Sequence, residues 1–261
     1  MQIAKDRIIQ IFSRLLSFLP NRLLRFLKIS IDCSLGYGSG GFDYKNEVSA
    51  IRHLLSGTSN PIVFDIGANR GDWAKEFLEQ VPGASMFCFE PDPSSEFEII
   101  NNVGVGRDIT IYNIALSNIS GTTSLFTTKA LWGGASIVPN EKREGYSTFE
   151  VPVTTLDDFV ANNLLFPDVI KIDVEGAEML VLLGGKRTLQ TTRIVEFEFG
   201  TNQFESKLYF KDFFEFFTSC GFEIGRITPN GLKPVQLYDP IEEYFRTTNL
   251  LAYRKLIRAR P

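Results

Sequence analysis

From residue 61 onward the chain alternates short apolar runs with segments in which apolar residues recur at helical spacing. The apolar runs predict buried strands, because short runs rich in valine, isoleucine and phenylalanine are typical of parallel sheets. They lie at residues 62–66, 85–90, 109–116, 169–173 and 193–199. The helical segments lie at residues 73–81, after Pro93 to about 103, 177–183 and 210–218. Such alternation predicts an α/β fold with a mostly parallel, doubly wound sheet.

Two segments depart from this alternation. Residues 117–155 hold several glycines and only short strand-like pieces, so we expect an insertion over one edge of the sheet. Residues 222–254 carry Pro-Asn-Gly at 229–231 between extended runs, which predicts a C-terminal antiparallel hairpin. We therefore predict one α/β domain over residues 61–261, preceded by a helical extension over residues 1–60.

The first 30 residues form an amphipathic pattern that is also basic. Its apolar side consists of Ile8, Phe12, Leu15, Leu16 and Leu19, and its polar side of Arg7, Gln10, Arg14 and Ser17. Residues 1–30 hold six basic side chains and one acid, and Pro20 interrupts the pattern. A basic amphipathic helix can lie on an anionic membrane surface. The alternative, which we favour, is a helix packed on the domain or on a second copy of the chain, because most amphipathic helices cover a core.

The composition narrows the class of protein. The 261 residues suffice for a full α/β core, and the formal net charge of −4 argues against a protein that coats nucleic acid. Cys33, Cys88 and Cys220 form no CxxC pair, so neither a disulfide framework nor a zinc cluster is expected. This cysteine usage favours the reducing cytoplasm. No apolar run reaches the roughly 18 residues that a membrane span requires.

The first predicted strand ends in a glycine-containing turn, Asp65-Ile-Gly67-Ala-Asn-Arg-Gly71, which leads into a helix. Open α/β sheets bind ligands at the carboxyl ends of their strands. We expect Gly67 and Gly71 to let the backbone approach a ligand, because a Cβ there would intrude. The spacing is neither the Gly-x-Gly-x-x-Gly of dinucleotide sites nor a phosphate-binding P-loop. An acid at Asp65 suits a ligand with an ammonium group.

Glu90 adds to this hypothesis. It ends the second predicted strand, 19 residues after Gly71, where an acid can accept hydrogen bonds from two ribose hydroxyls. Each acid alone would be interpreted as structural, Asp65 as a turn-stabilising residue and Glu90 as a solvated strand end. Together, at this spacing, they favour a nucleoside ligand.

Four stretches carry a family resemblance, in the order VFDIGANRGDWA, FCFEPDP, YNIALSN and VIKIDVEGAEMLVLLGG. Over about residues 60–200 the chain resembles the FkbM family of methyltransferases, and residues 170–178 are the most family-specific part. The resemblance implies a Rossmann-like class I enzyme that uses S-adenosylmethionine to O-methylate hydroxyls on sugars or polyketides. It assigns donor binding to Asp65, Gly67, Ala68, Asn69 and Gly71. It also implies ribose contact from Glu90 and an adenine-side wall from Ala115 and Leu116.

Methyl transfer to a hydroxyl requires an aligned acceptor and a base or a metal that removes its proton. Asp173 and Glu198 are the candidates, because both are expected at carboxyl ends of neighbouring strands. They would serve either as a carboxylate base or as oxygen ligands for Mg²⁺. The alternative is an internal salt bridge with Lys171 or Lys186, and Lys171 is expected to neutralise this cluster. His53, the only histidine, is expected to be structural.

Two other functions compete with an O-methyltransferase. An NAD-dependent oxidoreductase on the same fold is disfavoured because both Gly-x-Gly-x-x-Gly and a Tyr-x-x-x-Lys helix are absent from the sequence. A non-catalytic nucleoside-binding module is disfavoured by the intact set of acids and glycines. An N-methyltransferase would show an Asn/Asp-Pro-Pro-Tyr-type motif where this chain has Ile172-Asp173-Val174-Glu175. We expect a sugar, glycan or glycolipid acceptor in the cytoplasm, with residues 1–60 and 117–150 shaping its site, and a homo-oligomer remains open.

Overall fold

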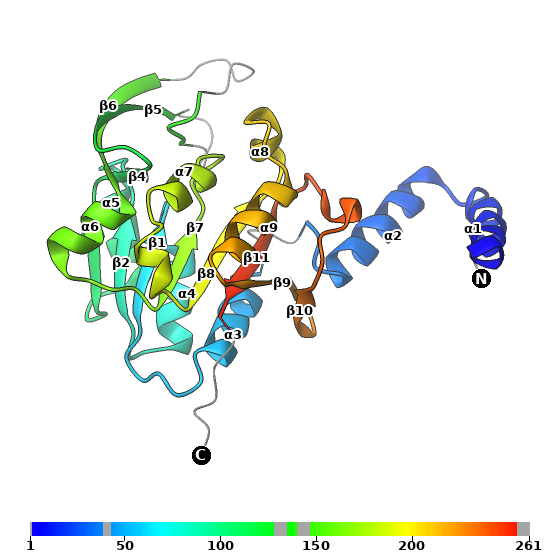
Figure 1. The fold of residues 1–261 in the computed structure, drawn as a ribbon, viewed down its shortest axis with the longest axis horizontal. Coiled ribbons are helices and arrows are strands. Elements are labelled where there is room, and N and C mark those ends of the chain that lie inside the picture. Colours follow the sequence, from blue (N-terminus) through cyan, green and yellow to red (C-terminus); the bar gives the residue numbers. More distant parts are fainter. Residues whose placement is uncertain (1, 39–42, 128–134, 140–146, 255–261) are drawn as a thin grey trace.

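The computed structural model describes residues 2–38, 43–127, 135–139 and 147–254. Its core is an eight-stranded sheet with the strand order β10-β9-β11-β8-β7-β1-β2-β3 (Figure 1). The parallel strands are β1 (Ile62–Ile66), β2 (Ser85–Phe89), β3 (Ile109–Tyr112), β7 (Val169–Ile172) and β8 (Ile194–Phe199). The antiparallel strands are β9 (Glu223–Thr228), β10 (Gly231–Val235) and β11 (Thr248–Tyr253).

The predicted mostly parallel sheet with a C-terminal hairpin is confirmed. Strands β9 and β10 pair antiparallel through a turn at residues 229–230. The sequence did not separate out β11, which inserts between β8 and β9 and pairs antiparallel with both. The strand direction therefore reverses at β11. The carboxyl ends of strands at which the sequence predicts a ligand all belong to the parallel strands.

Helices cover both faces of this sheet, as the alternation of side chains along each strand requires. Val63 faces a layer of apolar residues that includes Phe77, whereas the next residue, Phe64, faces a second layer that includes Phe159. The helices of the first layer are α3 (Tyr44–Leu54), α4 (Asp72–Gln80) and α5 (Ser95–Val103). The second layer includes α6 (Leu156–Asn163), α7 (Glu178–Leu183) and α9 (Phe210–Ser219). The short α8 (Thr201–Glu205) follows β8.

The single strand expected at residues 109–116 is in fact two strands in two sheets. Strand β3 ends at Tyr112, and the chain leaves the main sheet before β4 (Ala115–Ser117). There β4 pairs with β6 (Ser147–Thr155), which pairs with β5 (Gly121–Thr127) to give a three-stranded sheet. A single strand-like run does not reveal this break, because apolar residues of both halves pack against apolar neighbours. Most of the described residues in the expected insertion at 117–155 therefore belong to this second sheet.

The helical extension expected over residues 1–60 divides into two parts. Helix α3 packs into the core of the domain. Helices α1 (Gln2–Leu16) and α2 (Asn21–Ser34) instead project from it as an arm, at the right of Figure 1. The arm, defined as residues 2–34, is not packed on the core of this chain, which was one of the two packings that we favoured: α2 has no buried residue, and residues 6–16 of α1 are all exposed. Within the described residues, no helix has the length and apolar character needed to cross a bilayer.

Candidate active site

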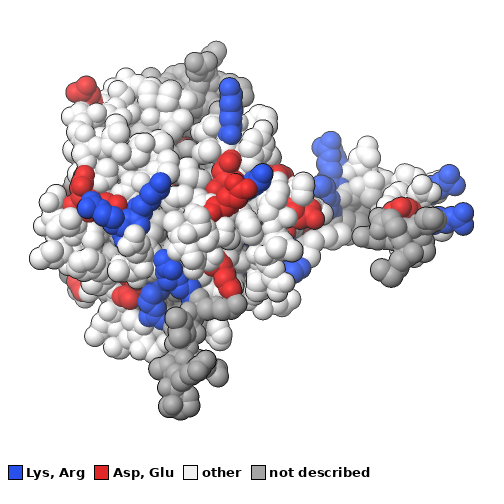
Figure 2. All heavy atoms as spheres, in the orientation of Figure 1, with Lys and Arg blue, Asp and Glu red and all other residues white. Residues whose placement is uncertain are grey.

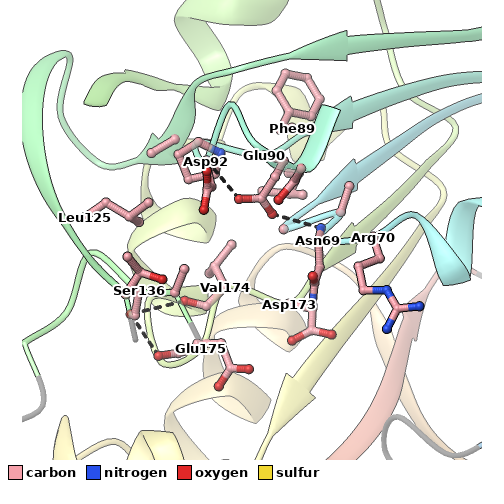
Figure 3. Close-up of a pocket in the computed structure, with 18 of the residues that line it drawn as sticks. Asn69, Arg70, Phe89, Glu90, Asp92, Leu125, Ser136, Asp173, Val174 and Glu175 are labelled. Carbon is pink, nitrogen blue, oxygen red and sulfur yellow. Dashed lines mark hydrogen bonds between the residues drawn. The ribbon is translucent and has the colours of Figure 1, made fainter. Parts of the chain in front are cut away.

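A cavity of about 510 Å³ opens at the carboxyl ends of β1, β2 and β7. Its size falls in the range of small-molecule sites. The turn after β1 and the residues that follow β2 and β7 form one side, and the second sheet forms another. Figure 3 shows polar side chains from both β2 and β7 converging on this space. The cavity therefore lies at the edge of the sheet where the sequence predicted a ligand.

The turn after β1 brings three of its five predicted donor-binding residues, Gly67, Ala68 and Asn69, to the cavity wall. Gly67 has φ +85°, and a Cβ there would stand 1.9 Å from the carbonyl oxygen of Asp173. The close approach of the chain after β7 thus requires a glycine here, and the approach of a ligand to the Gly67 backbone stays a prediction. Gly71 begins α4 with φ +76°, packs against α5 and lies outside the cavity lining.

Glu90 is held at the end of β2 by two backbone donors. The amide of Asn69 donates to Oε2 at 2.9 Å, and the amide of Asp92 donates to Oε1 at 3.0 Å (Figure 3). Burial raises the pKa of the Glu90 carboxyl to about 7, although both N–H donors act to lower it. A carboxylate oxygen can accept more than one hydrogen bond, so both oxygens retain capacity for hydroxyls in the cavity.

The predicted adenine-side wall also lies at the cavity. Ala115 and Leu116 line it from β4, next to Phe89 at the end of β2 and Leu125 of β5. Asp92 lines the cavity beside them, and its Oδ1 accepts hydrogen bonds from the amide and hydroxyl of Ser94. The sequence pattern assigns no role to Asp92, although its place between two prolines marks a fixed turn.

A buried ion-pair chain links the ends of β1 and β7. The ammonium of Lys171 lies 3.5 Å from Asp65 Oδ1 and 3.1 Å from Asp173 Oδ2, and it is 5.8 Å from the ring centre of Trp73. Burial alone would lower the pKa of Lys171, but Asp173, Asp65 and Glu196 outweigh it and raise that pKa well above its usual value. Lys171 is therefore a fixed cation that neutralises the cluster, as the sequence indicated.

This arrangement places Asp65 and Asp173 differently. Asp173 lines the cavity, and its side chain is 26% exposed. Asp65 is fully buried outside the cavity lining, and the ammonium group that it faces belongs to Lys171. Its assignment to donor binding stays a prediction, with Lys171 between it and Asp173.

Glu198 lies in β8, outside the cavity lining and only 8% exposed. Burial, together with Asp173 and other nearby carboxylates, raises its pKa well above the usual value. The loop that follows β7 is held by Glu178, whose Oε1 accepts the amides of Val174 and Gly176 at 3.0 and 3.1 Å. On the other side, the hydroxyl of Ser136 donates to the carbonyl of Glu175 at 3.0 Å. The hydrogen bond from Ser136 thus connects the loop after β7 to residues that precede β6 in the chain.

Several lining residues were not predicted individually. Tyr44 comes from α3 and Trp73 from α4, and Lys171 of β7, which was predicted only as the cation of the acidic cluster, also lines the cavity. Burial raises the pKa of Tyr44 to about 12, so it is a neutral hydroxyl at physiological pH. The insertion contributes Leu125, Thr127, Ala135, Ser136, Ile137, Ser147 and Phe149. Only the general expectation that residues 1–60 and 117–150 shape the acceptor site pointed to Tyr44 and this set.

The structure offers no support for Mg²⁺, which the sequence left open as an alternative to a carboxylate base. In the part of the chain that the structure describes, no group of three or more His, Cys, Asp and Glu side chains is placed to hold a metal ion. His53 is exposed on α3, outside the cavity lining, in line with a role outside the chemistry.

Comparison with known proteins agrees with this geometry. The model of the methyltransferase FkbM domain matches residues 65–224, which confirms the resemblance seen in the sequence. The 2-O-methyltransferase NoeI of Sinorhizobium fredii is 30% identical over 189 residues, which cover 67% of this chain and 77% of that protein. The hexuronic acid methyltransferase AglP of Haloferax volcanii is 28% identical over 156 residues, which cover 59% and 62%.

The fold is also that of a solved structure. The chain superposes on the methyltransferase FkbM from Methylobacillus flagellatus with a TM-score of 0.51 and 16% sequence identity. The superposition covers 80% of this chain but only 47% of the other. The central sheet is therefore that of Rossmann-like class I methyltransferases.

Proposed function

We propose that this chain, which belongs to the FkbM methyltransferase family, transfers a methyl group from S-adenosylmethionine to a hydroxyl of a sugar, glycan or glycosylated metabolite. The observation that carries the proposal is the set of residues that line a single cavity. Glu90 and Asp173 lie at the ends of two strands, on either side of β1, and the apolar residues of β4 stand beside them.

The residues present fit such a donor. Glu90 offers two carboxylate oxygens, each already oriented by one backbone N–H, to the two hydroxyls of a ribose. Ala115 and Leu116 offer an apolar wall to an adenine ring. The turn after β1, which includes Ala68, forms another part of the cavity wall, where its backbone would lie close to a bound donor. When bound, the donor supplies a methyl group that is already activated by its positive sulfur.

Asp173 is the residue that we propose as the base for the acceptor hydroxyl. Lys171 holds Oδ2 in place at 3.1 Å and leaves the other oxygen for the hydroxyl. Because Lys171 is itself fixed by Asp65, the carboxylate has little freedom to turn away from the cavity. Tyr44 lines the same cavity and offers a neutral hydroxyl that would orient the acceptor.

Glu198 receives a different role from the one expected from the sequence. Its raised pKa favours the protonated form, which is a poor base, and it does not line the cavity. We propose that it acts through Asp173 as a positioning residue. This assignment predicts a small effect on turnover when Glu198 is replaced by its amide.

The two curated relatives support the acceptor class. NoeI is named as a 2-O-methyltransferase, and AglP as a methyltransferase of hexuronic acid. Both names describe methylation, and the second names a sugar acid. A sugar hydroxyl is thus the acceptor that we propose first.

A transfer assay tests the proposal. The protein is incubated with S-adenosylmethionine labelled on the methyl group and an extract of glycans and sugar metabolites, and labelled products are identified by mass spectrometry. We expect the label in a carbohydrate whose mass has risen by one methylene, and Asp173→Asn abolishes it. Binding of the donor without any transfer would support a nucleoside-binding module instead. Binding of NAD, with no response to S-adenosylmethionine or its demethylated product, would support an oxidoreductase.

A further inference from the structure

The arm formed by α1 and α2 exposes an unusual amount of apolar surface. On α1, Ile8, Ile11, Phe12 and Leu15 are each between 56% and 61% exposed. On α2, Phe26 is 65% exposed, and Phe18 between the helices is 85% exposed. Contiguous apolar surface of this kind marks a site of interaction with a protein or a membrane.

The charge of the arm distinguishes between a protein partner and a membrane. Residues 1–34 carry the basic residues Lys5, Arg7, Arg14, Arg22, Arg25 and Lys28 and only the acids Asp6 and Asp32, whereas the whole chain has more acids than bases. Figure 2 shows Lys and Arg side chains along the arm at the right. Arg7 and Arg14 lie two helical turns apart on one edge of the apolar face of α1. Basic residues that flank an apolar face suit an anionic lipid surface, into which the apolar side chains insert.

The same charges disfavour a second copy of the arm as the partner. Two arms packed together would bring like charges close, with few acids to balance them. Asp32 is already engaged, because the ammonium of Lys28 and the hydroxyl of Tyr244 both donate to its Oδ2, at 2.5 and 2.7 Å.

The arm is attached firmly to the domain at its base. The guanidinium of Arg226 donates to the carbonyl of Leu35 at 3.1 Å and lies 4.2 Å from the ring centre of Tyr37. The hydroxyl of Tyr37 donates to Glu242 at 3.0 Å. These contacts attach the segment that follows α2 to β9, which carries Arg226, and to the turn that carries Glu242. The arm is therefore attached to the domain at the end of α2.

We propose that α1 and α2 form a docking arm that lies on an anionic lipid surface, with its apolar face inserted and its arginines at the headgroups. The arm lies on the bilayer without crossing it, consistent with the absence of a membrane-spanning helix among the described residues. This proposal does not depend on the reaction that the cavity catalyses.

Co-sedimentation of the whole chain with vesicles tests it. One vesicle type contains phosphatidylcholine alone, and the other has about one lipid in three replaced by phosphatidylserine. We expect binding to the anionic vesicles, weakened as salt is raised because screening reduces the attraction of the basic residues. Equal sedimentation with both vesicle types, or none with either, would overturn the proposal.

Two variants and a matched control locate the contact. The charge variant replaces four exposed arm residues: R7Q, R14Q, R22Q and R25Q. The control replaces four exposed lysines of the domain: K75Q, K186Q, K211Q and K233Q. We expect the first to weaken binding by about 100-fold or more and the second by about threefold or less. Equal losses in the two would mean that net charge, and not the arm, governs binding.

The apolar variant F12S/L15S/F26S distinguishes a membrane from a second copy. These side chains are exposed, so we expect the variant to melt within a few degrees of the wild-type protein. It should lose vesicle binding and leave the sedimentation coefficient in the absence of lipid unchanged. A wild-type dimer that this variant converts to monomers would show that the arm joins two copies, and would overturn the proposal.

Discussion

Replacement of Glu90 by glutamine tests the donor site at its best-defined residue. The carboxylate accepts two backbone amides, from Asn69 and Asp92, at 2.9 and 3.0 Å. A glutamine must turn its NH₂ group toward one of these donors, so one hydrogen bond is lost and that side of the residue no longer accepts. With the contacts to the donor's hydroxyls also impaired, we expect a loss of about 1–3 kcal/mol in the binding free energy, or roughly 5- to 150-fold in Kd.

The pH dependence of donor binding gives a second signature of the same residue. Burial raises the pKa of Glu90 to about 7 in the free protein. Two hydroxyl donors stabilise the ionised carboxylate, so the pKa falls when the donor binds, and binding releases a proton at and below pH 7. Affinity is therefore highest above pH 7 and decreases as the pH falls, by at most about tenfold per pH unit.

Calorimetry with S-adenosylmethionine and its demethylated product, between about pH 8 and pH 6, measures both effects. Glu79→Gln is the matched control, because Glu79 is exposed on α4 and lies outside the cavity lining. We expect the control to bind like the wild-type protein and Glu90→Gln to bind more weakly, without the fall in affinity toward low pH. Unchanged affinity in Glu90→Gln, with the same pH dependence as the wild type, would refute the assignment of Glu90 to the donor.

Three further outcomes follow from the geometry. Gly67→Ala should destabilise the protein by more than about 3 kcal/mol in thermal or urea unfolding, because its Cβ would stand 1.9 Å from the carbonyl oxygen of Asp173. Gly104→Ala, with φ +93° and no atom within 4 Å of the added Cβ, should cost only about 1–2 kcal/mol. Asp173→Asn should lower kcat by about 10²–10⁴-fold with the fold intact, whereas Glu198→Gln should lower it less than about tenfold; the reverse order would restore Glu198 as the base. EDTA should leave turnover unchanged, and a loss that Mg²⁺ reverses would reveal a metal site.

Much of the main sheet could be predicted because its strands are buried on both faces and bounded by turns. Residues 62–66 and 169–172 have strand length and are apolar except for Asp65 and Lys171, and their neighbours have helical spacing. Helix α6 was missed although Thr155 caps it by accepting the amide of Asp158 at 3.0 Å, a pattern that the sequence displays. Strand β11 could not be placed, because local patterning does not specify which strands it separates.

Prediction of the site from the sequence was limited mainly to residues next to the ends of predicted strands. Glu90, Ala115 and Leu116 could be found because they follow strand ends on which a family pattern places them. Tyr44 could not, because its segment lies before the first strand and only packing of α3 brings it to the cavity. The residues of β5 and β6 were equally hidden, since the second sheet is formed by pairing over long separations in sequence.

The position of Asp65 changes the interpretation of the turn after β1. An acid there was expected to meet a ligand's ammonium group, but in this chain it faces the ammonium of Lys171, which in turn holds Asp173. The backbone couples the same strand ends, because the amide of Asp173 donates to the carbonyl of Ile66 at 3.0 Å and the missing Cβ of Gly67 admits the Asp173 carbonyl. The donor turn and the proposed base therefore form one rigid unit. It follows that a change at Asp65 should disturb the acceptor side of the cavity as well as the donor side, although Asp65 itself lies outside the cavity lining.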